Sequence, residues 1–147
     1  MIRAITENDW HGWKPLWDGY VDFYREEIPE DTTRVTFERI CNRRDEMFGF
    51  VAEVEGKLVG LAHALLHRST WTVGNACYLE DLFVAGSARG GGVARELIEG
   101  VTTEAAARGA EKLYWHTQEF NGPARSLYDL VARRVSFVVY ERDLPRV

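Results

Sequence analysis

The chain has 147 residues, 46% of them hydrophobic and 28% charged, and its formal net charge is −5. This length is typical of one domain with a buried core, so we expect a single domain spanning residues 1–147. Because nucleic acids are bound by positively charged surfaces, the acidic balance argues against a nucleic-acid partner. No apolar run is long enough to span a bilayer, so we expect a soluble protein with no membrane partner.

Cys41 and Cys77 are the only cysteines, and neither belongs to a CxxC pair. This spacing suits neither a zinc site nor a disulfide framework, so it favours a reducing, cytoplasmic location. His63 and His67 are four residues apart, which on a helix would suggest a metal pair. Their segment is predicted as a strand, where the two rings lie too far apart to share an ion, and we expect no metal.

The first third of the chain predicts a short strand and two helices. Residues 2–5 have the pattern of a strand, and Thr6 with Asp9 indicates a capping box before a helix. Aromatic residues recur at helical steps along that helix, at Trp10, Trp13, Trp17, Tyr20 and Tyr24. We expect most of these rings in the core and those at the C-terminal end beside a substrate opening. Residues 28–31 are predicted to break the helix, and residues 36–42 to form a second one.

From residue 48 the hydrophobic period becomes that of strands. Strands are predicted over 48–54 and 57–66, joined as a hairpin at Glu55-Gly56, and over 76–84 after a turn-rich loop. A glycine-rich turn at 86–92 leads into a helix over 91–108, which Gly109 ends. A strand over 112–117, a helix over 121–133 and a last strand over 135–141 complete the chain. This order predicts an α/β fold in which an antiparallel hairpin leads into a parallel strand–helix–strand unit.

The glycine-rich turn Arg89-Gly90-Gly91-Gly92-Val93-Ala94 lies between a strand and a helix. Glycines let a ligand approach the backbone, and the free amides of a helix's first turn attract an anion. The turn therefore suits a phosphate ligand, although a tight turn that needs glycine only for its geometry remains an alternative. A dinucleotide fingerprint would need glycine where Arg95 stands, and the Lys-Ser/Thr pair of a P-loop is absent.

The turn and its surroundings resemble the GNAT superfamily of N-acetyltransferases. Arg89-x-x-Gly92-x-Ala94 is similar to that family's acetyl-CoA loop, and Asn121-x-x-Ala124-x-x-Leu127-Tyr128 is similar to its second CoA element. The run Tyr78–Val84 looks like the branch containing polyamine, thialysine and small histone/polyamine acetyltransferases. The entry to the last strand departs from the family, since Val135-Ser136-Phe137 stands where a Gly-Phe pair is common.

The resemblance implies the GNAT fold, a mixed and mostly antiparallel sheet with a splayed parallel pair at the acetyl-CoA site and helices on both faces. It implies acetyl-CoA as cosubstrate, with the diphosphate on main-chain amides of the turn and the pantetheine arm along the preceding strand. The implied cofactor-binding residues are Leu82, Phe83, Val84, Arg89, Gly90, Gly91, Gly92, Val93, Ala94, Arg95, Asn121 and Ala124. It also implies a homodimer through the last strand and the strand around Leu61.

The implied activity is acetyl transfer to a primary amine of a small molecule (a polyamine, diamine or lysine-like compound) by direct attack in a ternary complex. Such a reaction needs a base for the ammonium and an acid for the leaving thiolate. Glu80 is the candidate base, or else a structural or ammonium-binding acid. Tyr128 is the candidate acid, or else a packing residue. On a regular strand Asp81 would face the opposite side and be structural or a dimer contact.

Four acids after the first helix either attract a polyamine or form a solvated run; they are Glu26, Glu27, Glu30 and Asp31. Three other functions remain open from the sequence. A protein lysine or N-terminal acetyltransferase would need an open peptide groove. A non-catalytic acyl-CoA-binding domain would share the turn but have no use for Glu80 and Tyr128. A nucleotide-binding oxidoreductase would bind NAD in place of CoA.

Overall fold

The computed structural model describes residues 1–146. The chain divides into two compact units, Met1–His116 and Thr117–Val147. The described part of the first unit contains one five-stranded sheet and the three helices α1, α2 and α3, and that of the second contains helix α4. Each unit is described by itself below. The single domain expected from chain length therefore stays a prediction.

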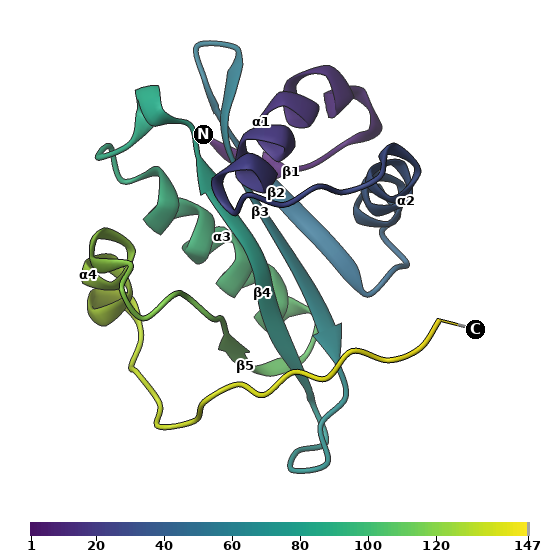
Figure 1. Cartoon of the computed structure of the whole chain (residues 1–147), viewed down its shortest axis with the longest axis vertical. Coiled ribbons are helices and arrows are strands. Elements are labelled where there is room, and N and C mark those ends of the chain that lie inside the picture. The colour runs from purple at the N-terminus through teal and green to yellow at the C-terminus, as the bar shows by residue number, and fades with distance from the viewer. Residues whose placement is uncertain (147) are drawn as a thin grey trace. The chain divides into compact units, whose positions relative to one another are not determined.

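The sheet has the strand order β1-β2-β3-β4-β5, so strands adjacent in sequence lie side by side (Figure 1). The first four strands pair antiparallel; they are β1 (Ile2–Ala4), β2 (Met47–Val54), β3 (Lys57–His67) and β4 (Asn75–Val84). The last strand, β5 (Ala110–Tyr114), pairs parallel with β4. The predicted hairpin is confirmed, because Glu55 and Gly56 have φ angles of 51° and 77°, which suit a two-residue turn.

The parallel pair separates after only a few residues. Strand β5 pairs with β4 from Asn75 to Tyr78, whereas β4 continues to Val84. The mixed sheet and its splayed parallel pair, which the resemblance implied, are both confirmed. Strand β5 lies at 110–114, slightly before the strand predicted over 112–117.

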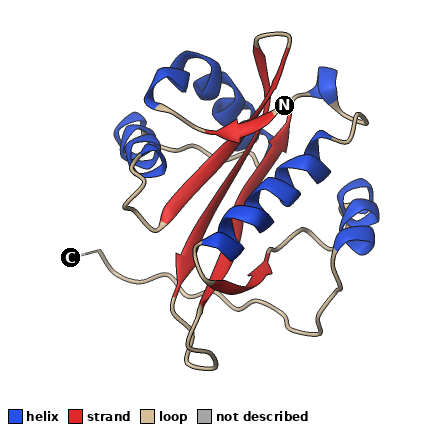
Figure 2. Cartoon of the chain, turned by 180° about the vertical axis from the view of Figure 1, so that it is seen from behind, coloured by secondary structure: helices blue, strands red, loops and turns tan. Residues whose placement is uncertain are grey.

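Helices cover both faces of the sheet, as expected. Helices α1 (Trp10–Phe23) and α2 (Glu30–Cys41) lie on one face, and α3 (Val93–Ala107) crosses the other (Figure 2). The alternation of β3 shows the same division. Leu61 belongs to the cluster with Trp13, whereas a Cβ on Gly60 would lie 3.2 Å from Leu97 and Val93 of α3.

The aromatic face of α1 forms much of the core on its side. Trp13 and Trp17 are buried and stack with ring centroids 5.6 Å apart, as the helical spacing predicted. The capping box before this helix is also present, because the Asp9 carboxylate accepts a 2.8 Å bond from the Thr6 amide. The expected helix break extends only to Pro29. Helix α2 begins at Glu30, and the negative charges of Glu30 and Asp31 in its first turn interact favourably with the helix dipole.

The surface expected around Leu61 for a dimer is not available. Strand β3 is paired on both edges, and the side chain of Leu61 is fully buried. The predicted dimer contact at this strand is therefore wrong, while the homodimer itself stays a prediction.

The second unit contains one helix, α4 (Gly122–Val131), among its described residues. Asn121 is its N-cap and its side chain accepts a 3.5 Å bond from the Ala124 amide. The strand predicted over 135–141 is wrong: up to residue 146 the segment pairs with no strand, and Phe137 and Tyr140 are exposed. A β-branched and aromatic segment forms a strand only where a sheet edge is available for pairing. No helix within residues 1–146 is long and apolar enough to cross a bilayer.

Candidate active site

The glycine-rich turn connects β4 to α3 through a short 3₁₀ helix, η2 (Gly86–Ala88). Gly90 and Gly92 have φ angles of 84° and 81°, and Gly92 is the N-cap of α3. Side chains with a Cβ rarely adopt this conformation, so the turn requires glycine at both positions. Gly92 has no side chain that could cap α3. The amides of the first turn of α3 are therefore available to bind a ligand.

Two features of the first unit fit the groups of acetyl-CoA. The amides and dipole at the start of α3, around Val93 to Arg95, suit a diphosphate. The edge of β4 that β5 leaves after Tyr78 suits an extended chain bearing amide groups, because it offers unpaired strand geometry over Leu82 to Val84. Arg89 donates a 3.1 Å bond from Nε to the Val84 carbonyl and so fixes the turn against the end of this strand.

Strand β4 has a bulge at Glu80. Its neighbours His63 and Ala64 on β3 pair with Asp81 and Leu79, which leaves Glu80 as the extra residue. The bulge turns both consecutive carboxylates toward the same side of the sheet. The expectation that Asp81 would face away from Glu80 is therefore wrong, because the strand is not regular there.

Both carboxylates line a cavity of about 390 Å³ between α1, α2 and the sheet, which we call the α1–β4 cavity. Its lining residues come from six segments and are Trp17, Tyr20, Val21, Tyr24, Glu26, Ile28, Thr32, Thr36, Ile40, Met47, His63, Ala64, Glu80 and Asp81. The aromatic residues at the end of α1 thus border an opening, as the sequence indicated. This volume is that of a small-molecule site.

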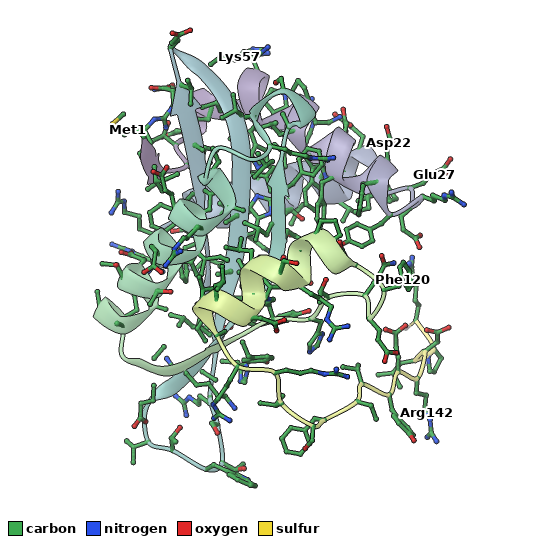
Figure 3. The ribbon with its side chains drawn as sticks, turned by 90° about the vertical axis from the view of Figure 1, so that its left-hand side faces the viewer. Met1, Asp22, Glu27, Lys57, Phe120 and Arg142 are labelled. Carbon is green, nitrogen blue, oxygen red and sulfur yellow. The ribbon has the colours of Figure 1, made fainter. Side chains whose placement is uncertain are left out.

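The charge of the α1–β4 cavity is negative. Glu26, Glu80 and Asp81 are among its lining residues, and that lining includes neither Lys nor Arg. Figure 3 shows two more acids, Asp22 and Glu27, projecting outward from the end of α1 and the turn after it. Glu30 and Asp31 instead belong to the first turn of α2. The acidic run is therefore divided between the cavity, the neighbouring surface and a helix terminus.

The pKa of Glu80 lies above its ordinary value. Partial burial is the largest cause, the nearby Asp81 charge adds to it, and His63 opposes it. A carboxylate with a raised pKa is a better proton acceptor than an ordinary surface acid. The same surroundings raise the pKa of Tyr20, through burial and then through Asp81.

Sequence reasoning missed the residues that support Asp81. The Trp13 indole donates from Nε1 to His63 Nε2 at 2.9 Å, and His63 Nδ1 lies 2.9 Å from Asp81 Oδ2. The sequence relates His63 only to His67, four residues later. His67 instead bonds the Tyr114 hydroxyl at 2.7 Å and the Arg68 carbonyl at 2.8 Å. No local signal joins Trp13 to His63, because only the fold brings them together.

Tyr128, Asn121 and Ala124 belong to the second unit. Tyr128 is half-buried on α4, two turns after the Asn121 N-cap, as the spacing predicted. In the first unit, burial raises the pKa of both thiols, Cys41 and Cys77, to about 11. Neither thiol is therefore activated as a nucleophile. Within residues 1–146, no three His, Cys, Asp or Glu side chains gather as a metal site would require.

A mixed sheet with a separating parallel pair, a glycine turn that begins α3 on one face and an acidic cavity on the other face together fit an acyl-CoA-dependent transferase. The model of the acetyltransferase (GNAT) family matches residues 13–130. The chain belongs to this family. It is an acetyl-CoA-dependent N-acyltransferase, which sets aside the oxidoreductase and the non-catalytic domain.

Two curated relatives match along most of the chain. The D-amino-acid N-acetyltransferase HPA3 of Saccharomyces cerevisiae is 34% identical over 145 residues, covering 97% of this chain and 90% of the relative. The uncharacterized N-acetyltransferase YhfO of Bacillus subtilis is 27% identical, covering 87% of this chain and 85% of the relative. The polyamine branch suggested by residues 78–84 gains no support from these matches.

Solved structures share the fold. The aminoglycoside acetyltransferase AAC(6')-Iy, bound to a bisubstrate analogue of CoA, has a TM-score of 0.84 at 21% identity, covering 99% of this chain and 98% of that one. A ribosomal-protein-alanine N-acetyltransferase of Brucella melitensis has a TM-score of 0.79 at 24% identity, covering 98% and 99%. At this identity the likeness concerns the fold alone.

Proposed function

We propose that the enzyme acetylates a primary amine of a small cationic molecule, such as a polyamine, a diamine or a lysine-like compound. The observation that carries this proposal is the charge of the α1–β4 cavity, which is lined by Glu26, Glu80 and Asp81 and by no Lys or Arg. Ammonium groups are attracted by such a lining, whereas the carboxylate of an amino acid would be repelled by it. Tyr20 and Tyr24 add aromatic faces on which alkylammonium groups pack well.

The chemistry is direct transfer in a ternary complex. Glu80 takes a proton from the ammonium, and the free amine then attacks the thioester carbonyl, forming the C–N bond. As the C–S bond breaks, Tyr128 gives its proton to the sulfur and recovers one from the amine nitrogen. Of the two protons that the nitrogen loses, one leaves through Glu80 to water and the other replaces that of Tyr128.

The cofactor residues have distinct roles in this proposal. Amides from Gly90 to Arg95 receive the diphosphate, and Arg89 holds the turn in place through the Val84 carbonyl. The β4 edge at Leu82, Phe83 and Val84 pairs with the pantetheine arm, and an amide near Leu82 polarises the thioester carbonyl. Asn121 and Ala124 contribute a second contact from the start of α4.

A second candidate acceptor is a D-amino acid, because a relative named for that activity is 34% identical over nearly the whole chain. A protein lysine or N-terminus is the alternative left by the sequence, and it would have to enter the same cavity as an extended side chain or chain end. The cavity's negative charge favours the lysine over a free amino acid.

An acceptor panel tests the proposal directly. Thiol release from acetyl-CoA would be measured with diamines, polyamines, a lysine with its carboxylate blocked, free D-amino acids, an aminoglycoside and a short peptide. We expect the carboxylate-free cations to exceed D-amino acids in kcat/KM by about tenfold or more. A preference for free D-amino acids would replace the proposal with the second candidate. Failure to acetylate any amine would refute it.

A further inference from the structure

Trp13, His63 and Asp81 form a chain of hydrogen bonds from three separate elements. Trp13 lies on α1, His63 on β3 and Asp81 on β4, and both links measure 2.9 Å. An indole nitrogen can only donate, so His63 Nε2 must accept and its ring proton must be on Nδ1. The Nδ1–H group then donates to Asp81 Oδ2. The chain of bonds therefore fixes one neutral tautomer of His63.

This series of hydrogen bonds is buried at the Trp13 end and reaches the α1–β4 cavity at the Asp81 end. Trp13 is fully buried, and the side chains of His63 and Asp81 are 5% and 13% exposed. A second proton on His63 Nε2 would face the indole N–H and break that bond. His63 is thus built to hold a carboxylate and not to carry protons.

Asp81 faces the cavity beside its strand partner His63, and the bulge leaves Glu80 as the extra residue next to it. Two consecutive carboxylates on one wall repel each other, so an arrangement that keeps both needs compensation. His63 compensates Asp81 by donating to Oδ2. The charged and titratable groups around Asp81 are His63 on β3, Tyr20 on α1, Tyr24 directly after α1, and Glu80 and Tyr78 on β4.

The two acids consequently differ in freedom. Glu80 is the unpaired residue of the bulge and is only partly buried, so its carboxylate can exchange a proton with water. Asp81 is held by a buried network, as a group that must keep a fixed position requires. Fixed carboxylates orient a cationic substrate, because the entropy of positioning has already been lost in folding.

We propose that Asp81 binds the acceptor's ammonium group and orients it toward Glu80, and that His63, held in its Nδ1–H form by Trp13, positions Asp81 for this task. The inference rests on the proposed cationic acceptor. Asp81 contacts the substrate, whereas His63 and Trp13 are positioning residues. The ligand recognised is a primary alkylammonium group.

Steady-state kinetics of paired variants separate this role from others. With the best amine of the panel, Asp81→Asn is expected to raise the amine KM by about tenfold or more, to change kcat less than fivefold and to leave the acetyl-CoA KM unchanged. His63→Leu should raise the amine KM in the same way. His63→Gln, which keeps one donor and one acceptor, should restore that KM to within about threefold of wild type.

The glutamine variant also tests whether His63 carries protons. Because glutamine does not titrate, His63→Gln should keep the kcat–pH profile of the wild type. Loss of the acidic limb, or a large fall in kcat with an unchanged amine KM, would show that His63 acts as a base and would overturn the inference. An amine KM unaffected by Asp81→Asn would overturn it as well. This last result leaves the proposed function standing, since the acceptor would still be acetylated.

Nitrogen NMR of the histidine ring provides a readout independent of activity. In the folded protein we expect the neutral His63 ring to show a protonated Nδ1 and an unprotonated Nε2, and Trp13→Phe to remove this fixed pattern. If His63→Leu does not fold, the glutamine and asparagine variants and this spectrum decide the matter. A His63 ring protonated at Nε2 would overturn the inference.

Discussion

The glycine turn and the α1–β4 cavity flank the same strand but are built in different ways. The turn is a local structure, in which Gly90 and Gly92 provide two left-handed residues within a few positions of the helix they begin. The cavity is assembled from distant segments, since Trp13 and His63 are 50 residues apart in sequence. A ligand site made of backbone is thus encoded locally, and a site made of side chains depends on the whole fold.

The largest expected effects concern the two proposed proton-transfer residues, Glu80 of the α1–β4 cavity and Tyr128 of α4. Glu80→Gln removes the base in the cavity and Tyr128→Phe removes the acid on α4, so each should lower kcat by about 10²-fold or more. Neither change should alter the acetyl-CoA KM, because neither side chain is assigned to the diphosphate. Stopped-time thiol release with the best amine measures both constants, and an unchanged kcat would contradict the assigned role.

A substitution in the turn should affect the cofactor alone. Gly92→Val forces a branched side chain into a φ of 81°, which disturbs the first turn of α3 and should weaken acetyl-CoA binding about tenfold. Gly86→Ala is the matched control, since φ there is not positive and no atom lies within 4 Å of the added Cβ. Titration calorimetry with CoA measures the difference. Equal affinities of the two variants would place the diphosphate elsewhere.

Local features of this fold could be predicted from the sequence, whereas features that depend on distant segments could not. Strands and helices were predictable because their periodicity is local, and the turn was predictable because glycine is required at particular φ angles. The bulge at Glu80 was not, because two acids within a strand do not by themselves indicate an extra residue. The bulge follows from the pairing of Asp81 and Leu79 with His63 and Ala64 on another strand.

In the C-terminal segment, described up to residue 146, the sequence predicted a strand that the structure does not contain. Residues 135–141 have the apolar, β-branched and aromatic composition of a strand, yet Phe137 and Tyr140 are exposed. The apolar residues of a segment indicate which side chains it could bury. Whether a sheet edge is available to pair with the segment depends on the rest of the fold.

The pH dependence of the reaction distinguishes the two cavity acids with a smaller effect. Burial and the Asp81 charge raise the pKa of Glu80, and the base works only when ionised. The kcat should therefore fall as the pH falls through this raised pKa. Asp81→Asn removes one of the two causes, so the acidic limb should move to lower pH. A limb that stays in place, or moves upward, would show that Asp81 does not act on Glu80.

The smallest effect is expected from the two thiols, which belong neither to the glycine turn nor to the lining of the α1–β4 cavity. Burial raises the pKa of Cys41 and Cys77 to about 11, so the thiolate needed for a covalent acetyl intermediate is scarce at neutral pH. The double variant Cys41→Ala/Cys77→Ala should keep kcat within about twofold, provided that its circular dichroism matches the wild type. Mass spectrometry of the wild type mixed with acetyl-CoA alone should find no acetylated cysteine. An acetylated thiol together with a large loss of kcat would replace direct attack with a two-step transfer, and the roles of Glu80 and Tyr128 would then have to be assigned to each step separately.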